Sequence, residues 1–445
     1  MNPSTRLAAT GVAVTVAAAP LPAANEAAAP RTFTPAYRTY VLVTLCVVGF
    51  LCYVDRIVIT MFMQPIKKDF GLTDTQLGLM TGLAFALLGG IAAIPLARMA
   101  DQRSRKWIIG GSLFVWTLMT AATGMATNYV QLLLARVGVG VGEAGCVPAS
   151  HSMLADYYPR ELRSRALGAH TAGQFLGMLG GMVMGGILVQ TVGWRAGFVW
   201  LGIGGLVLYA IFHLTVREPV RVDEQRNPAL PAASVMRRLG DLKCFAWLVV
   251  AFATTNFAGS IAAWLPTYLE RAFALQPMQI GLGLGLSLGL ATSIGALTGG
   301  QLGVRYSKHS KSWASRFTAV VSFAVMPMYV GTLYAPTPAI AFTLLFATFI
   351  LAGMIAGPVF ATLQDLVDPS VRATGTAIVA LAGVVVGQGM GPLVVGFLSD
   401  LWQAGPNSVS GLRMAMTAVA LVNFLTVWVF WSLGRRIDLL GSRAR

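Results

Sequence analysis

Residues 217–243 read REPVRVDEQRNPALPAASVMRRLGDLK, and this is the longest polar stretch after the N-terminal tail. Moving outward from it, we count six long apolar runs on its N-terminal side and six on its C-terminal side. A stretch of this kind, flanked by equal numbers of apolar runs, indicates a chain built from two similar halves with a polar connection between them.

Each of the twelve apolar runs is close to or above the roughly 20 residues that a helix needs to cross about 30 Å of hydrocarbon. A spanning segment must satisfy its own backbone hydrogen bonds, so we expect helices. The predicted spans are 39–64, 74–97, 107–127, 129–153, 166–191, 195–216, 244–268, 279–304, 314–334, 338–362, 374–400 and 412–434.

The bulk composition supports a membrane protein. Hydrophobic residues make up 56% of the chain and charged residues 11%, against about 45–50% and about 25% in globular proteins. The net charge of +15 could suggest a nucleic-acid partner. However, the basic residues lie in short loops between apolar runs, as the positive-inside rule requires. We therefore expect membrane lipid around the protein and no nucleic acid.

The distribution of Lys and Arg also predicts the orientation. With the N-terminus inside, the outer loops hold only Lys67, Lys68, Arg195, Arg271 and Arg413. This bias places both termini in the cytoplasm, and we expect a bacterial inner membrane. Residues 1–36 mimic a signal peptide, but cleavage would put the new N-terminus outside, so we expect a disordered cytoplasmic tail.

An internal repeat supports the division into halves. A first block around Phe70–Leu79 recurs at Phe273–Leu282, and a second block around Pro148–Gly186 recurs at Pro358–Gly396. A duplicated six-helix unit is typical of transporters whose site lies between the repeats. The predicted domains are a tail (1–36), an N-terminal bundle (37–216), a cytoplasmic loop (217–243), a C-terminal bundle (244–434) and a cytoplasmic tail (435–445).

Four charges fall well inside predicted spans, away from the span ends: Asp55 and Arg56 in the first, Arg136 and Glu143 in the fourth. Each costs at least about 2.5–3.5 kcal/mol at the centre of a helix, and such residues usually face the bundle interior and pair with one another. A static ion pair between the two helices is one explanation. The other explanation is a functional site. Apolar packing could replace a purely structural ion pair at little cost, so the presence of four charges favours a functional site.

The depths of these charges suggest a mechanism. Asp55 and Arg136 lie at similar depths, and Glu143 lies two turns beyond Arg136, about 10 Å nearer the cytoplasm. Arg136 is a permanent cation. If it moves between the two acids, their proton affinities change in opposite directions. We therefore predict Asp55, Arg136 and Glu143 as proton-coupling residues.

The C-terminal half lacks matching acids, because Ala258 and Gly353 occupy the equivalent positions. A cavity with one charged wall and one apolar wall suits an amphipathic substrate. The candidate substrate-binding residues are Tyr53, Arg56, Arg136, Glu143, His151, Asn256 and Trp264.

The loop ARMADQRSRK at 97–106 places a carboxylate before a group of cations. Asp101 could cap the helix that begins near Thr374, where the helix dipole favours an anion, although an ordinary positive-inside loop is the alternative. The candidate gating residues are Asp101, Arg105, Arg163 and Arg165.

Enzyme chemistry has no visible basis in this sequence. The four histidines are isolated, and there is no nucleophile–base arrangement, phosphate loop or zinc spacing. The four cysteines fall in apolar runs without metal spacing. We therefore expect no enzymatic activity, no cofactor and no metal.

The loop at 97–106 resembles the helix 2–3 signature of the major facilitator superfamily, Gly-x-x-x-Asp-Arg-x-Gly-Arg-Lys, and departs from it at Ala97, Gln102 and Ser104. Four further stretches resemble the Spinster family of lysolipid and sphingosine-phosphate transporters. They are Tyr53-Val54-Asp55-Arg56, the segment from Arg136 to Gly142-Glu143-Ala144, Arg163-Ser164-Arg165 and Arg217-Glu218-Pro219.

This resemblance implies an all-α major facilitator fold, with twelve transmembrane helices in two pseudo-symmetric six-helix bundles. It also implies a monomeric, proton-linked carrier of amphipathic lipids, with the first, fourth, seventh and tenth helices lining the cavity. Two alternatives stay open: export of drugs or organic anions on the same fold, and a membrane receptor or scaffold that does not transport.

Overall fold

The computed structural model describes residues 33–219, 234, 239, 244–306, 312–367, 371–402, 405 and 408–443. Within these residues the chain is helical and contains no strand. Most of the predicted N-terminal tail and of the central loop 217–243 lies outside the described residues.

Twelve helical segments are long and apolar enough to cross a membrane, which confirms the predicted number. In the first half they are α1 (Pro35–Phe70), α2–η1–α3 (Asp74–Gly78, Leu79–Leu83, Ala84–Gln102), α4 (Arg105–Met125), α5–α6 (Tyr129–Glu143, Cys146–Tyr157), α7 (Arg160–Thr191) and α8 (Gly193–Thr215).

In the second half they are α10–η2–α11 (Phe245–Gly259, Ser260–Trp264, Leu265–Phe273), α12–η3–α13 (Pro277–Gly285, Leu286–Ala291, Thr292–Tyr306), α14 (Trp313–Leu333), α15 (Pro338–Leu366), α16–η4–α17 (Arg372–Ala382, Gly383–Met390, Gly391–Trp402) and α18–α19 (Val409–Leu421, Asn423–Arg443).

Local signals fix where these helices start. The Thr34 hydroxyl caps α1 by accepting a hydrogen bond from the N–H of Tyr37, as is usual at an N-cap. In α2, Gln76 completes a capping box with Thr73, and in α12 Gln279 does the same with Gln276. The repeat seen in the sequence is therefore also a repeat of helix geometry.

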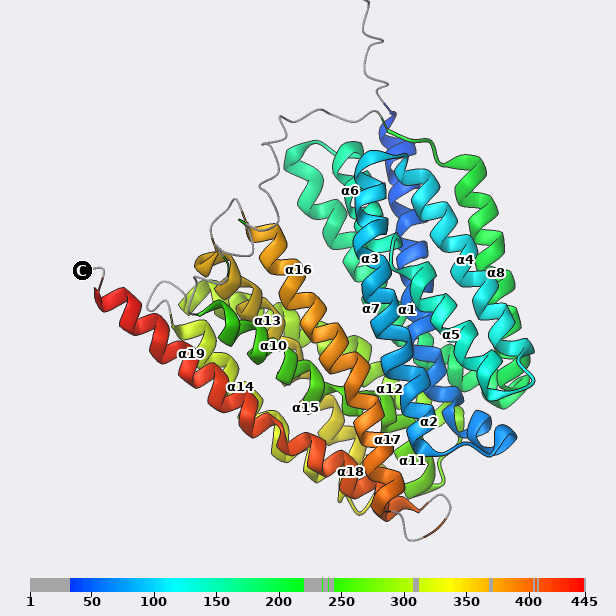
Figure 1. Ribbon diagram of the computed structural model, residues 1–445, viewed down its shortest axis with the longest axis vertical. Coiled ribbons are helices and arrows are strands. Elements are labelled where there is room, and N and C mark those ends of the chain that lie inside the picture. The colour runs from blue at the N-terminus through cyan, green and yellow to red at the C-terminus, as the bar shows by residue number, and fades with distance from the viewer. Residues whose placement is uncertain are drawn as a thin grey trace, which may run out of the picture.

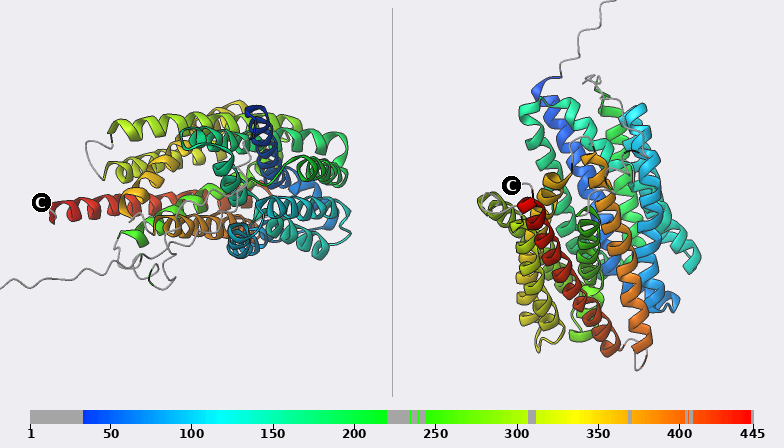
Figure 2. Two further views of the ribbon diagram at one scale, coloured as in Figure 1. Left: turned by 90° about the horizontal axis from the view of Figure 1, so that it is seen from above. Right: turned by 60° about the vertical axis from the view of Figure 1, so that its left-hand side comes forward.

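The two halves of the chain form two groups of helices, blue to green and green to red (Figures 1 and 2). We call the end where α1 begins and α8 ends the terminal side, and the opposite end, where α1 ends at Phe70, the far side. Tyr37 donates a hydrogen bond to the carbonyl of Thr215 on the terminal side, at 2.8 Å.

The bundles meet on the far side, where α2 packs on α17 and α7 on α12. Backbone contact there requires glycine: a Cβ on Gly78 of α2 would lie 2.3 Å from the carbonyl oxygen of Pro392 in α17. One hydrophobic core joins the far ends of both bundles, through residues such as Ile66, Leu77 and Val395. A second core, with Leu45 and Trp116, belongs to the N-terminal bundle alone.

Candidate functional site

The four intramembrane charges of the N-terminal bundle form two ion pairs. Arg56 Nε lies 2.5 Å from Glu143 Oε2, and Arg136 Nη1 lies 3.6 Å from Asp55 Oδ2. The side chains of Asp55, Arg136 and Glu143 are almost completely buried. The structure thus brings all four charges together, but Glu143 pairs with Arg56 and not with Arg136.

Neutral neighbours hold these charges in place. The Thr120 hydroxyl donates a hydrogen bond of 3.0 Å to Asp55 Oδ2. The guanidinium carbons of Arg56 and Arg136 lie 5.5 and 5.6 Å from the centre of the same Phe85 ring. Arg56 also lies 5.4 Å from the Tyr53 ring centre. The faces of aromatic rings attract cations, so Phe85 favours the close approach of two like charges.

Helix α5 packs very closely on α3 at the site and ends beside it. A Cβ on Gly140 would lie 2.6 Å from the carbonyl oxygen of Phe85, so only glycine lets α5 approach α3 this closely. Helix α5 then ends at Glu143, and α6 begins at Cys146. The fourth span is therefore interrupted directly after the acid that binds Arg56.

The charged cluster retains unused hydrogen-bonding capacity. Asp55 Oδ1, Glu143 Oε1 and the Nε and Nη1 atoms of Arg136 are buried and lack a hydrogen-bond partner among the described residues. An unsatisfied buried polar atom costs about 1–3 kcal/mol, and more when the group is charged. A proton, a water molecule or a polar ligand atom that used these positions would therefore be bound favourably.

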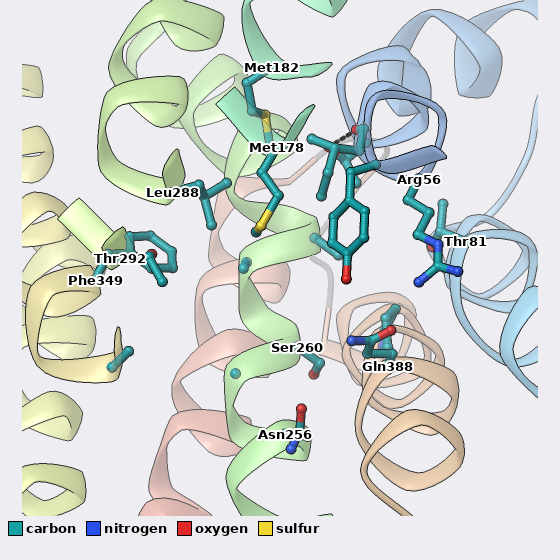
Figure 3. Close-up of a pocket in the computed structure, with 18 of the residues that line it drawn as sticks. Arg56, Thr81, Met178, Met182, Asn256, Ser260, Leu288, Thr292, Phe349 and Gln388 are labelled. Atoms are coloured by element: carbon teal, nitrogen blue, oxygen red, sulfur yellow. Dashed lines mark hydrogen bonds between the residues drawn. The ribbon is translucent and has the colours of Figure 1, made fainter. Parts of the chain in front are cut away.

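A cavity of about 390 Å³ lies between the two bundles and reaches this cluster. Its N-terminal wall carries Tyr53, Arg56 and Arg136, and its C-terminal wall is mostly apolar with a few amides and hydroxyls (Figure 3). In Figure 3, Arg56 and Gln388 lie on one side of the cavity and Leu288 and Phe349 on the other. Further lining residues are Thr81, Phe85, Met178, Met182, Asn256, Ser260, Thr292 and Tyr329.

The other predicted substrate-binding residues lie elsewhere. Trp264 is fully buried, and its indole donates a hydrogen bond of 3.0 Å to the carbonyl of Pro392. His151 packs its ring against His170 at 5.0 Å. Glu143 reaches the cavity only through its partner Arg56. Sequence reasoning missed Met178, Leu288 and Gln388, because neutral residues in a spanning helix carry no signal that separates cavity from core.

The predicted gating residues do not form a link between the bundles in the part of the chain that the structure describes. Arg105 forms ion pairs with Asp156 and Glu218, and it donates a hydrogen bond of 3.0 Å to the carbonyl of Ser152. All of these partners belong to the N-terminal half. The side chain of Asp101 lies outside the described residues, so its predicted contact with the helix near Thr374 does as well.

The remaining gating candidates and the partner of Arg105 lie on the terminal side. Arg163 donates to the carbonyl of Tyr158 at 3.3 Å, and Arg165 is exposed. Glu218 accepts hydrogen bonds from the backbone N–H groups of Arg105 and Lys106. Burial alone would raise the pKa of Glu218, but these hydrogen bonds lower it below the usual value.

A far-side ion cluster does join the two bundles, and sequence reasoning missed it. Arg271 of α11 donates hydrogen bonds of 2.8 and 2.7 Å to the two carboxylate oxygens of Asp74 in α2. Asp74, which is fully buried, also accepts from Lys67 at 2.6 Å and from Ser399 at 2.7 Å. The sequence signal was the presence of Lys67 and Arg271 among the few outer basic residues.

Asp400 of α17 extends this cluster. Its carboxylate accepts hydrogen bonds from the N–H groups of Asp74 and Thr75, at 3.0 and 2.7 Å. It therefore caps the first turn of α2 from the other bundle, where the helix dipole favours an anion. We call Lys67, Asp74, Arg271, Ser399 and Asp400 the far-side cluster.

Comparisons with known proteins agree with this architecture. The family model described as Major Facilitator Superfamily matches residues 45–392. An MFS-type efflux pump of Mycolicibacterium smegmatis is 31% identical, over 86% of this chain and 90% of its own length. Protein spinster homolog 1 of Xenopus tropicalis is 25% identical, over 87% of this chain and 78% of its own.

A solved structure is also similar along most of its length. It is the crystal structure of a bacterial homolog to the human lysosomal transporter Spinster, in an inward-facing and unoccupied conformation. The TM-score is 0.84 and the identity 26%, with 91% of this chain and 98% of that chain covered.

Proposed function

This chain belongs to the major facilitator superfamily and resembles its Spinster members, and on that premise we propose that it carries an amphipathic anion across the membrane. The substrate class is a lysolipid or a sphingoid-phosphate-like molecule, transport occurs by alternating access, and protons drive it. The observation that carries this proposal is a pair of buried ion pairs at the wall of a cavity whose opposite wall is apolar.

The geometry of Arg56 supports an anionic headgroup. Its side chain is 30% exposed, whereas that of its partner Glu143 is completely buried. The guanidinium thus has a face toward the cavity while Glu143 holds it from behind. A phosphate is well matched to a guanidinium, which donates two parallel hydrogen bonds to it.

The apolar wall supports a hydrocarbon tail. Met178 and Met182 from α7 line the same cavity as Leu288 and Phe349 of the C-terminal bundle. Unbranched thioether side chains adapt their shape to flexible apolar ligands. A headgroup at Arg56 would therefore place its tail along this wall.

The proposed proton coupling rests on the contact between Glu143 and Arg56. Glu143 neutralises Arg56 while it is ionised, and a proton on Glu143 removes that charge. Arg56 is then free to bind the substrate anion, so substrate binding and protonation favour each other. Asp55 and Arg136 provide a second acid–base pair beside the first, with an unused carboxylate oxygen on Asp55.

Alternating access requires one closed and one open side. The far-side cluster closes the far side in this structure, because it connects α2 with α11 and α17. We propose that the terminal side faces the cytoplasm of a bacterial inner membrane, because the positive-inside rule places it there. The far side must then open for the substrate to cross.

Reconstituted transport tests the proposal. Purified protein in liposomes is given radiolabelled lysophospholipids and sphingoid phosphates, with and without an imposed pH gradient. We expect uptake above that of empty liposomes, and faster uptake when protons flow in the direction of the substrate. Uptake that does not exceed that of empty liposomes for any such lipid would contradict the proposed substrate class.

A second candidate substrate class has its own support. The efflux pump of Mycolicibacterium smegmatis is 31% identical to this chain, against 25% for the spinster homolog. Hydrophobic drugs or organic anions would occupy the same cavity. Competition decides between the two: strong inhibition of lipid uptake by such compounds, together with their own proton-driven movement, would favour an exporter.

A further inference from the structure

A second buried polar site lies in the N-terminal bundle, apart from the ion pairs. The rings of His151 in α6 and His170 in α7 meet edge to face, with their centres 5.0 Å apart. His170 is 1% exposed, and Gln174, one turn further along α7, is 8% exposed. We call His151, His170 and Gln174 the histidine site.

Every member of the histidine site has a polar atom without a partner. His151 Nε2, His170 Nδ1 and Gln174 Nε2 are buried and make no hydrogen bond within the described residues. Each such atom costs about 1–3 kcal/mol. Three of them from two neighbouring helices are the donor and acceptor set that one buried water needs, since a buried water makes about 2–4 hydrogen bonds.

The histidine site lies between the ion pairs and the terminal side. A Cβ on Gly49 of α1 would lie 3.2 Å from His170 Nε2 and 3.4 Å from Gln174 Cγ, so these side chains face α1 at that level. Gly49 precedes Arg56 by two helical turns, or about 10 Å toward the terminal side. The fourth span runs from the far side to the terminal side, and His151 follows Glu143 by eight residues along it. His151 is therefore also nearer the terminal side than the ion pairs.

Resting on the function proposed above, we propose that the histidine site binds water and carries protons between Glu143 and the solution on the terminal side. A neutral imidazole has one ring nitrogen that accepts a proton and one that donates a proton, and it is the usual side chain of proton shuttles. In this path His170 is the fully buried member and His151 is the half-buried one. The bound water connects the two rings.

The surroundings leave this role to the histidines. Across α1, Cys46 presents its backbone and Cβ to Gly173 beside the site. On α6, Asp156 already forms an ion pair with Arg105. The other charged groups toward the membrane interior form the two ion pairs Arg56–Glu143 and Arg136–Asp55. Within the described residues, only the imidazoles combine a titratable ring with a buried ring nitrogen that has no hydrogen-bond partner at this place.

Hydroxyl-radical labelling tests the water without any need for transport. X-ray radiolysis of the full-length protein in nanodiscs oxidises side chains that lie beside bound water, and mass spectrometry locates the products. After correction for intrinsic reactivity, we expect much faster labelling of His170 than of Phe198, although the first is 1% and the second 0% exposed. Equal, background labelling of both would overturn the water site, whatever the protein transports.

Transport by two histidine variants tests the relay. His170→Gln keeps a hydrogen-bonding side chain but does not titrate. We expect its proton-driven uptake to fall to the level that wild type shows without a pH gradient, while substrate counterflow stays unchanged. His213→Gln is the matched control, since His213 packs on Trp107 at the surface of the same bundle, and we expect wild-type behaviour from it.

Two results would overturn the relay. Unchanged proton-driven uptake in His170→Gln would show that protons reach Glu143 another way. Parallel loss of uptake and counterflow, without recovery in His170→Asn, would show that His170 only supports the structure. Absence of proton-driven uptake in wild type would contradict the proposed function. The labelling experiment would still test the water site independently.

Discussion

Arg271 donates two hydrogen bonds, of 2.8 and 2.7 Å, to the carboxylate of Asp74 across the boundary between the two bundles. Their side chains are 4% and 0% exposed. Breaking a buried ion pair by removing one partner costs about 3–5 kcal/mol, because an uncompensated charge remains. This contact, together with the cap that Asp400 places on α2, therefore contributes strongly to closure of the far side.

Arg271→Gln is expected to shift the protein toward opening on the far side. Asp74 then keeps one hydrogen bond from Lys67 and one from Ser399. It loses its bidentate partner in the other bundle. Pulsed electron–electron double resonance between spin labels at Met125, which is 72% exposed, and Ser410, one in each bundle, measures the opening. We expect a new population at longer distance in the variant.

Arg195→Gln is the control for this experiment. Arg195 also forms a far-side ion pair, with Asp69, but both residues belong to the N-terminal bundle and are about 40% exposed. Surface pairs of this kind are worth about 0–1 kcal/mol, so the distance distribution should match wild type. If the two variants gave the same distribution, the far-side cluster would not control closure.

Glu143→Gln is expected to uncouple transport from protons. Glutamine can still accept a hydrogen bond from Arg56, but it carries no charge and binds no proton. Proton-driven uptake in liposomes should therefore be lost, while counterflow of labelled against unlabelled substrate continues. Asp55→Asn should show the same pattern if the second ion pair also takes part.

Asp156→Asn is the control for the acid variants. Asp156 lies on the terminal side, paired with Arg105, and it does not line the cavity described here. Its replacement should leave proton-driven uptake intact. Unchanged proton-driven uptake in both Glu143→Gln and Asp55→Asn would remove the proposed coupling, and the fold alone would stand.

The sequence predicted some parts of this site and not others, for physical reasons. The twelve spans depend on local composition, so they were predicted to within a few residues at most ends. Buried charge is costly anywhere in a membrane, so Asp55, Arg56, Arg136 and Glu143 were evident at once. The partner of Glu143 was not, because neighbouring residues on a helix point in different directions and only packing decides which one reaches α5.

Long-range contacts were beyond local patterns. Asp74 and Arg271 lie 197 positions apart, and Lys67 and Arg271 look in the sequence like ordinary exceptions to the charge bias. Likewise, Arg105 was predicted as a gating residue, yet its ion-pair partners in the structure are Asp156 and Glu218, which the chain reaches before the C-terminal bundle begins. A contact between distant segments depends on helix tilt and register, which periodicity does not encode.

Glu218 is expected to make thermal stability depend on pH in a defined window. Its pKa is lowered in the folded protein by the hydrogen bonds from Lys106, Ser104 and Arg105, which outweigh the effect of burial. A lowered folded-state pKa contributes stability above the unfolded value, about 4.3, and this contribution is lost as pH falls through the folded value.

The melting temperature of Glu218→Gln should therefore lie below that of wild type at pH 7. The difference should shrink as the pH falls below about 4, where the carboxyl becomes protonated in both folded and unfolded chains. Thermal-shift measurements on the two proteins across this range provide the test. A difference that stays constant over the whole range would mean that the charge of Glu218 plays no part.

Arg56→Lys and Leu288→Ala are expected to separate recognition of the headgroup from recognition of the tail. Lysine keeps the charge beside Glu143 but loses the planar guanidinium, so affinity for phosphate-bearing lipids should fall for every chain length. Leu288 lies on the apolar wall, so its truncation removes buried area, worth about 25 cal/mol per Å². Affinity should then fall for long-chain ligands and remain unchanged for short ones. Ligand-induced thermal shifts over a series of chain lengths measure both effects, and equal losses at all lengths in Leu288→Ala would place the tail elsewhere.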